Sequence, residues 1–176
     1  MTDAGDAPAI DPREFRNVMG RFATGVTVVS FMREGAPAGM TVNSFLSVSL
    51  EPPLVLVSVR NAADFNAHMR VGECYGVNVL CEGQEHLSRY FATRPTPGSN
   101  VPFRDYRGTP LVEGSLAQLI ARVCEIHPVG DHRLYIGRVE HLWYGREAKP
   151  LIFFSGRYKE VDAHEPVPRG SVVDGW

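Results

Sequence analysis

Cysteine is scarce in this chain. Its 176 residues include three cysteines, an odd number, and Cys74, Cys81 and Cys124 form no Cys-x-x-Cys motif. That spacing indicates neither a disulfide framework nor a zinc site. We therefore predict no metal, and we expect the thiols to be small buried hydrophobic groups rather than redox centres.

An excess of charge of one sign is also lacking, as are long hydrophobic runs. Eighteen basic and twenty acidic residues give a net charge of −2, without a Lys/Arg cluster that would suit nucleic acid. No stretch approaches the ~18 apolar residues of a membrane span. The first ten residues contain Asp3 and Asp6 and no apolar run, so no signal peptide is predicted. The expectation is a cytoplasmic protein that binds neither nucleic acid nor membrane.

Several motifs of common enzymes are missing. No Gly-x-Gly-x-x-Gly follows a predicted strand, and Gly-x-x-x-x-Gly-Lys does not occur. If the protein binds a nucleotide, it therefore does so without a Rossmann or P-loop cradle. Without Gly-x-Ser-x-Gly or His-Glu-x-x-His, serine and zinc hydrolases lack support.

What the chain does contain is a series of short strand-like runs and few helices. Asp11 can cap a helix with Pro12 at its first position, which Gly20 or Gly25 would end. Strands are expected at 26–32, 39–42, 45–50, 54–59, 75–80, 116–126, 133–144 and 151–161, short helices at 62–69 and 85–91, and a long loop at 93–107. This pattern favours a mainly β fold with a closed architecture. The length suits one domain, predicted at 11–161, between flexible tails at 1–10 and 162–176.

The segment 41–49 carries hydroxyl and amide side chains before a Glu-Pro-Pro turn and the apolar run 54–57. Side chains alternate between the faces of an extended strand. An irregularity near Asn43 and Ser44 would bring backbone N–H groups and both side chains toward one ligand edge. Such an edge suits a flat polar heterocycle, although a polar edge strand with an Asx turn explains the same residues.

Three further candidates follow predicted strands or turns. His132 comes after Gly130 and Asp131 at a turn, where Asp131 could fix its tautomer, although a turn histidine is more often merely solvated. Arg60 and Asn61 come directly before a predicted helix, as a phosphate site or an ordinary cap. The aromatic candidates for ring stacking are Phe45, Phe65, Phe91, Phe153, Phe154 and Tyr158. Most are expected in the core, and Tyr158 is the best candidate because a glycine precedes it by two positions.

Five ordered blocks then carry a resemblance that covers about residues 11–161. They read Phe-Arg-x-Val-Met-Gly-x-Phe-Ala-Thr-Gly-Val-Thr-Val-Val at 15–29, Thr-Val-Asn-Ser-Phe-Leu-Ser-Val-Ser-Leu-Glu-Pro-Pro-Leu-Val at 41–55, Val-Asn-Val-Leu at 77–80, Gly-Asp-His-x-Leu-x-Ile-Gly-x-Val at 130–139 and Pro-Leu-Ile-Phe-Phe-x-Gly-x-Tyr at 150–158. The chain resembles the short-chain flavin reductases, the reductase halves of two-component flavin-dependent monooxygenases.

The resemblance implies a six-stranded split β-barrel, usually a homodimer, which oxidises NADH or NADPH, reduces FMN or FAD, and supplies reduced flavin to a separate monooxygenase. Ser44 or a neighbouring amide would contact flavin N5, and His132 would position the nicotinamide. The residues implied in cofactor binding are Met40, Thr41, Val42, Asn43, Ser44, Phe45, Ser47, Ser58, Val59, Arg60, Asn61, Phe65, Ser88, Arg89, His132 and Tyr158.

One departure from the family leaves the flavin open. Family members often have Ser-x-Thr after the fourth strand, where this chain reads Ala-Ala-Asp-Phe-Asn at 62–66. Phosphate would then rely on Arg60, backbone amides or Ser88 and Arg89, and FAD becomes as serious a candidate as FMN.

Three rival functions stay open. A flavin-binding or sensing module would hold flavin without oxidising NADH. A split-barrel oxidase of a pyridoxine phosphate would need a richer Arg/Lys cluster. A structural interaction domain leaves the polarity of 41–49 unexplained.

Overall fold

The computed structural model describes residues 9–93, 101–145 and 147–161. The predicted tails fall largely outside these ranges, as does much of the predicted loop at 93–107. The strands are β1 (Thr24–Gly25), β2 (Thr27–Arg33), β3 (Ala36–Val42), β4 (Phe45–Leu50), β5 (Pro53–Arg60), β6 (Cys74–Val79), β7 (Phe103–Tyr106), β8 (Thr109–Val112), β9 (Ala117–Val129), β10 (His132–Tyr144), β11 (Ile152–Phe154) and β12 (Arg157–Lys159). The helices are α1 (Pro12–Met19), α2 (Phe65–His68), α3 (Glu85–Ala92) and the 3₁₀ turn η1 (Glu82–Gln84). The fold is mainly β with short helices, as predicted.

One seven-stranded antiparallel sheet forms the body of the molecule, in the order β3-β2-β6-β9-β10-β5-β4. Its two edge strands, β3 and β4, are consecutive in the chain, and only Asn43 and Ser44 separate them. Two linking residues span roughly 10 Å at most, so the sheet has to curl until its edges meet. The barrel is therefore split along a seam at Asn43 and Ser44. Its sheet has seven strands instead of the six implied by the resemblance.

The barrel interior is filled by large apolar side chains that point inward from alternating strand positions. Phe65 of α2 enters this interior with no exposed surface. Its ring lies edge-on to Phe31, Tyr75 and Tyr135 at centroid distances of 5.0 to 5.9 Å. α2 thus acts as a plug at one end of the barrel.

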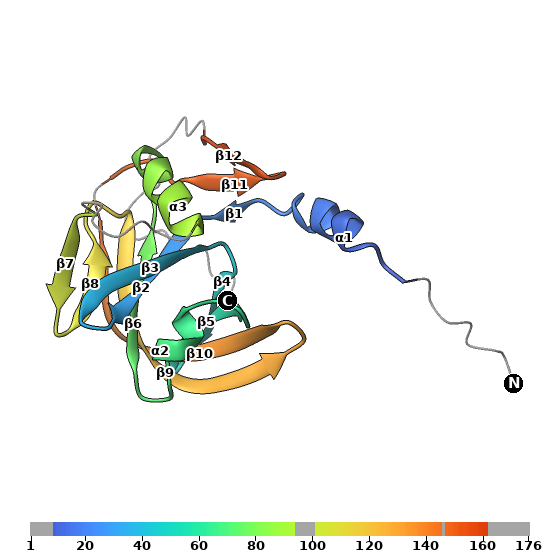
Figure 1. Cartoon of the computed structure of the whole chain (residues 1–176). Helices are drawn as coiled ribbons and strands as arrows, with labels where there is room; N and C mark the ends of the chain where they lie inside the picture. The colour runs from blue at the N-terminus through green and yellow to red at the C-terminus, as the bar shows by residue number, and fades with distance from the viewer. Residues whose placement is uncertain (1–8, 94–100, 146, 162–176) are drawn as a thin grey trace, which may run out of the picture.

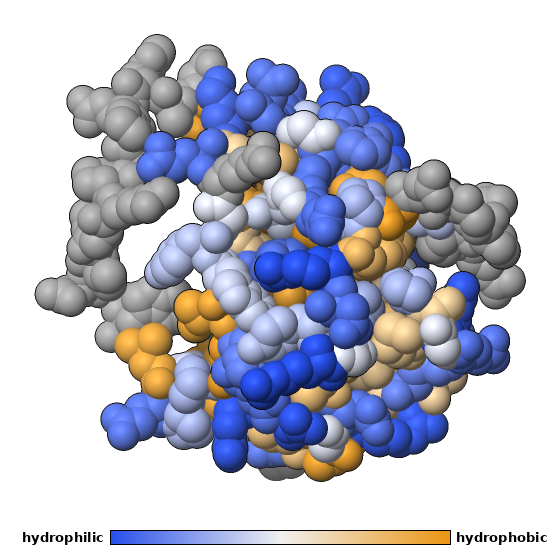
Figure 2. Space-filling model, turned by 90° about the vertical axis from the view of Figure 1, so that its left-hand side faces the viewer, coloured by the Kyte–Doolittle hydropathy of each residue, from blue (hydrophilic) through white to orange (hydrophobic). Residues whose placement is uncertain are grey.

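The outer face of β2 and β6 is covered by the chain itself. α3 and the β7–β8 hairpin lie against this side (Figure 1), and Val28, Leu87 and Phe91 form part of a second apolar cluster there. Asn78 is completely buried in this layer and has four hydrogen-bonding partners. When the molecule is viewed from the side of the β7–β8 hairpin, hydrophilic residues dominate the surface, and hydrophobic ones lie in separated groups (Figure 2).

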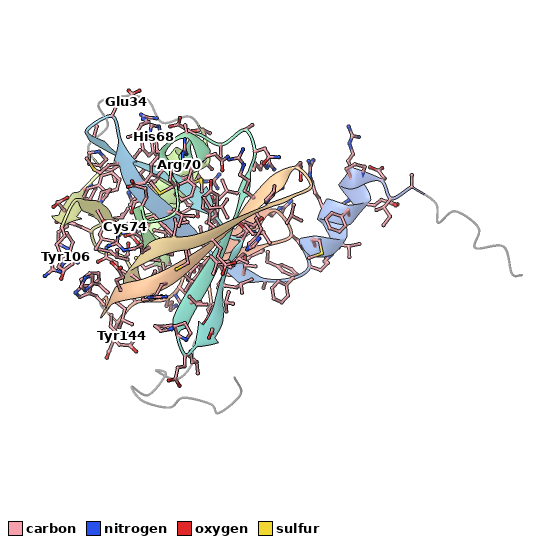
Figure 3. All side chains as sticks on the ribbon, turned by 90° about the horizontal axis from the view of Figure 1, so that it is seen from below. Glu34, His68, Arg70, Cys74, Tyr106 and Tyr144 are labelled. Carbon is pink, nitrogen blue, oxygen red and sulfur yellow. The ribbon has the colours of Figure 1, made fainter. Side chains whose placement is uncertain are left out.

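On the opposite side, no element of the described ranges covers the sheet in the same way. α1 stands apart from the sheet (Figures 1 and 3) and buries none of its residues. β4 turns its leucine and valine side chains outward, so that Leu46, Val48 and Leu50 are 49%, 44% and 72% exposed. On β4 the apolar residues are exposed and the serines between them are half-buried, so the strand has an apolar outer face beside the seam.

Some local predictions were wrong. The segment 62–69 is helical only at Phe65–His68. The expected strand 151–161 is a hairpin of β11 and β12, because Ser155 and Gly156 adopt positive φ angles and form a turn. Part of the expected loop at 93–107 is β7, paired with β8. The three cysteines are half-buried rather than buried, and Cys74 lies on the side away from α1 (Figure 3).

Candidate functional site

The seam of the barrel is the irregularity expected near Asn43 and Ser44. The Ser44 hydroxyl donates to the Ser58 carbonyl at 2.7 Å, and the Ser58 N–H donates to the Ser44 carbonyl at 3.1 Å. These bonds fix the corner between β3 and β4 against β5. The Asn43 side chain is exposed and engaged in no hydrogen bond within the described chain. Its amide is therefore available to a ligand.

A cavity of about 1490 Å³ opens beside this seam. Three parts of the chain surround it: α1 with the segment that follows, the seam with β5, and the β11–β12 turn. The lining residues are Phe15, Arg16, Asn17, Met19, Gly20, Arg21, Phe22, Ala23, Thr24, Gly25, Thr27, Asn43, Ser44, Phe45, Leu46, Leu56, Ser58, Arg60, Val79, Phe153, Ser155 and Gly156. A bond from the Ser155 N–H to the Gly20 carbonyl, 2.7 Å long, joins two of these walls.

The charge in the cavity is of one sign. Arg16, Arg21 and Arg60 line it, and none of its lining residues is acidic. None of the three guanidinium groups forms an ion pair within the described part of the chain. Arginine recognises phosphate and carboxylate through its planar fork of donors. Unpaired arginines around one cavity thus favour an anionic ligand.

His132 is outside the cavity lining and lies beside Arg60, which belongs to it. It is the direct neighbour of Arg60 in the antiparallel β5–β10 pair, so the two side chains share one face of the sheet. Its Nδ1 lies 2.7 Å from Asp131 Oδ1, which leaves Nε2 for another partner. The hydrogen bond with His132, followed by the positive charges of His132 and Arg60, lowers the pKa of the Asp131 carboxyl. The carboxylate therefore stays charged and holds the ring.

A second group of predicted residues meets between β3, α3 and β12. The Thr41 hydroxyl donates to the Ser88 carbonyl at 2.7 Å, and the Ser88 and Tyr158 hydroxyl oxygens lie 2.8 Å apart. The Arg89 guanidinium lies 4.8 Å from the centre of the Tyr158 ring and pairs with Glu85 at 2.6 Å. These residues contact one another, and none of them lines the cavity.

The remaining predicted residues lie around or behind the site. Val59 and Phe65 are 2% and 0% exposed and belong to the barrel interior, so both support the site from behind. Met40 and Val42 pack against the same interior. Ser47 is half-buried on β4. Asn61 donates its backbone N–H to the Asp131 carbonyl at 2.9 Å and thereby links the turn after β5 to the turn between β9 and β10.

The cavity wall from Phe15 to Gly25 was missed as part of the site. The helical spacing of Phe15, Val18 and Met19, with Phe22 beyond, indicated a helix, and in the structure these four side chains are 53% to 72% exposed. The available signal was charge: Arg16 and Arg21 interrupt the apolar residues of this segment, and no acidic residue follows Glu14 until Glu34.

The donor set of the cavity fits a flavin nucleotide. An isoalloxazine requires hydrogen-bond partners along its polar edge, and Asn43, Ser44 and Ser58 lie together at the seam. The buried Thr24 hydroxyl in the cavity wall has no partner within the described chain, and a buried polar group of this kind calls for one. Arginines supply the countercharge for phosphate. No group of three or more His, Cys, Asp or Glu side chains suits a metal within the described ranges.

The fold and the cavity thus define a split β-barrel with a site for an anionic aromatic ligand. The chain belongs to the flavin reductase like domain family, whose model matches residues 19–162. It is 42% identical over 158 residues to an NADH-dependent flavin reductase of Rhodococcus, covering 88% of this chain and 89% of that protein. It is 37% identical to the reductase subunit of a flavin-dependent monooxygenase from Rhodococcus jostii, covering 92% and 84%.

A solved structure agrees with this assignment. The flavin reductase PheA2 in its native state superposes with a TM-score of 0.82 at 42% sequence identity, covering 88% of this chain and all of that one. Among the described residues, no helix has the length and apolar character needed to cross a bilayer.

Proposed function

We propose that this protein is an NADH-dependent flavin reductase that reduces FAD or FMN and passes the reduced flavin to a separate monooxygenase. The observation that carries the proposal is the cavity at the barrel seam, where hydroxyl and amide groups meet three unpaired arginines without a carboxylate. Two of the similar proteins support it, one named an NADH-dependent flavin reductase and the other a monooxygenase reductase subunit.

Each side chain has a role in binding or orientation. A flavin held here would supply the hydride acceptor for reduced nicotinamide, which is chemistry that side chains cannot supply. Asn43 and Ser44 would hydrogen-bond the polar edge of the ring, and an amide near Ser44 would stabilise negative charge at that edge. His132, held by Asp131, positions the nicotinamide through its Nε2 side. The protein therefore contributes orientation and a fixed electrostatic environment.

The test of this function is an absorbance assay of NADH oxidation with added FMN and then FAD. We expect turnover that depends on added flavin, and a repeat with NADPH gives the nicotinamide preference. Tight flavin retention with negligible NADH oxidation would instead identify a flavin-binding or sensing module. Absence of both flavin binding and turnover would refute the assignment.

The role of His132 has its own test. We expect His132→Ala to raise the KM for the nicotinamide at least fivefold while the Kd for flavin changes less than twofold. His127→Ala is the matched control, because His127 is an exposed histidine on the same β9–β10 hairpin and, unlike His132, has no cross-strand neighbour in the cavity lining. If turnover and nicotinamide KM are unaffected by His132→Ala, the proposed role is wrong.

We also propose that the protein is a homodimer. Large apolar residues of α1, its flanks and β4 are exposed, and four of them lie outside the cavity lining: Ile10, Val18, Val48 and Leu50, which are 44% to 74% exposed. A second copy would cover these four, whereas the exposed Phe15, Met19, Phe22 and Leu46 face the cavity. An eight-residue helix is marginal alone, so a second copy would stabilise α1.

Substitution at Val18 separates a dimer from a monomer. Val18 is 68% exposed and lies outside the cavity lining, and Val18→Asp would place a charge inside the proposed interface. Sedimentation equilibrium should give the mass of two chains for the parent protein and of one chain for the variant. Val71→Asp is the matched control, because Val71 is 64% exposed and lies outside the apolar face. A monomeric parent protein would refute the dimer and leave the enzymatic proposal standing.

A further inference from the structure

The three arginines of the cavity lie on two different walls. Arg60 is on β5, two residues beyond Ser58, and therefore within about 7 Å of the seam along the strand. Arg16 and Arg21 lie on α1 and on the segment after it. If the flavin ring rests at the seam, as the proposed function requires, Arg60 is available to a phosphate close to the ring. Arg16 and Arg21 form a second cationic wall with no assigned partner.

The second wall also carries apolar rings. Phe15 and Phe22 line the same side of the cavity and are 56% and 72% exposed. Aromatic faces next to arginines suit a base that can stack, joined to a phosphate. The cavity volume of about 1490 Å³ exceeds the ~300–1,000 Å³ of an ordinary ligand site. The space thus extends beyond what one flavin mononucleotide requires.

We infer that Arg16 and Arg21 are specificity residues that select FAD over FMN. FAD differs from FMN by a second phosphate and an adenosine, which are the two chemical groups that the α1 wall would recognise. The guanidinium groups bind the diphosphate, and Phe15 or Phe22 stacks on the adenine. FMN occupies the seam and Arg60 alone and gains nothing from this wall.

Equilibrium binding to the flavin-free protein tests the inference without relying on turnover. Quenching of flavin fluorescence gives the Kd for FAD and for FMN in the parent protein, in Arg16→Gln, in Arg21→Gln and in the double variant. We expect each single change to weaken FAD binding about tenfold and FMN binding less than twofold. Phe22→Leu should weaken FAD binding threefold to tenfold, with FMN again changed less than twofold.

Arg13→Gln is the matched control. Arg13 lies on the same helix, is exposed and does not line the cavity, so this variant should bind both flavins as the parent protein does. α1 buries no residue, and circular dichroism should show an unchanged fold for all of these variants. ADP, which carries the diphosphate and adenosine without the ring, should compete with FAD in the parent protein and lose that ability in the double variant.

The dinucleotide NADH carries a diphosphate and an adenosine as well, so its binding is measured in parallel. An increase in the KM for NADH without a change in the Kd for FAD would assign the α1 wall to the nicotinamide nucleotide and overturn the inference. Equal weakening of FAD and FMN would also overturn it, while flavin reduction itself would stand. If the parent protein binds neither flavin, the failure lies with the proposed function.

Discussion

β2 and β4 are built from similar residues but meet different surroundings. β2 reads Thr-Val-Val-Ser-Phe-Met-Arg, and its first five residues are buried, because α3 and the β7–β8 hairpin cover its outer face. β4 reads Phe-Leu-Ser-Val-Ser-Leu and exposes every second residue, all of them apolar. The chain thus supplies its own cover on one side of the barrel, and on the other side no described element covers the apolar residues of β4. Side chains on the covered side should mainly determine stability, and side chains on the uncovered side should mainly determine binding.

Truncation of a leucine on each side gives the largest expected contrast. Leu111 of β8 is fully buried, and Leu111→Ala should lower the free energy of unfolding by roughly 3–4 kcal/mol through lost burial and a cavity. Leu50→Ala on β4 should cost less than about 0.5 kcal/mol when it is measured in the Val18→Asp background, since the residue is 72% exposed in one chain. Urea denaturation measures both. Equal losses at the two positions would contradict the division into a covered and an uncovered side.

Two asparagines sharpen the same contrast for polar groups. Asn78 donates to the Val28 carbonyl and the Ser30 hydroxyl and accepts from the Val112 N–H, so Asn78→Ala leaves buried partners unsatisfied at a cost of roughly 2–3 kcal/mol. Asn43→Ala at the seam should change stability by less than about 0.5 kcal/mol and weaken flavin binding severalfold. Urea titration and flavin fluorescence separate the two effects. A stable Asn78→Ala variant would show that the network is not needed for folding.

Two glycines test how closely each side is packed. A Cβ on Gly76 would lie 2.5 Å from the Ser30 hydroxyl and 2.8 Å from the Pro110 carbonyl, whereas one on Gly25 meets nothing within 4 Å. Gly76→Ala should therefore cost roughly 1–3 kcal/mol by overpacking, and Gly25→Ala less than about 0.5 kcal/mol. Thermal unfolding compares them. If Gly76→Ala is neutral, the β8 layer is looser than these distances imply.

The strands of the main sheet could be predicted from the sequence better than the elements that surround it. β-branched runs identified β2, β5 and β6, and Asp11 with Pro12 marked the start of α1. The β7–β8 hairpin was missed because the prolines and the glycine between 93 and 107, Pro102 among them, suggested a loop, although β7 and β8 pair as a two-stranded sheet that tolerates Pro110. β11 and β12 were predicted as one strand because their apolar and aromatic residues run through a two-residue turn. Local pattern identifies strands, and it does not show what will cover them.

The candidate site divides along the same line. The seam at Asn43 and Ser44 could be predicted from the sequence, because polar residues interrupt the apolar strand pattern there. The α1 wall could not be predicted in this way, because an amphipathic helix has the same sequence pattern whether its apolar face packs on its own core, a ligand or another chain. Tertiary placement alone distinguishes these cases, and it brings Arg16 and Arg21 into the cavity with Arg60.

The smallest expected effect concerns the Asp131–His132 pair on the uncovered side. The pair lowers the pKa of Asp131 in the folded protein, so its contribution to stability is present above the ordinary carboxyl pKa of about 4 and is lost as pH falls through the lowered value. Asp131→Asn should therefore reduce the melting temperature slightly at pH 5 to 7, and the two proteins should converge as the pH falls below the lowered carboxyl pKa. The carboxylate is exposed, so added salt should shrink the difference.

The control is the same substitution without the imidazole. In a His132→Ala background, Asp131→Asn should leave the melting temperature unchanged across this pH range, because the hydrogen bond that lowers the carboxyl pKa is absent. A difference that persists below the lowered carboxyl pKa, or that survives in the His132→Ala background, would show that Asp131 acts through the backbone of the β9–β10 turn. The expected change in melting temperature is small because the Asp131–His132 pair lies on the uncovered side. There it orients the imidazole ring for a ligand and contributes little to the stability of the fold.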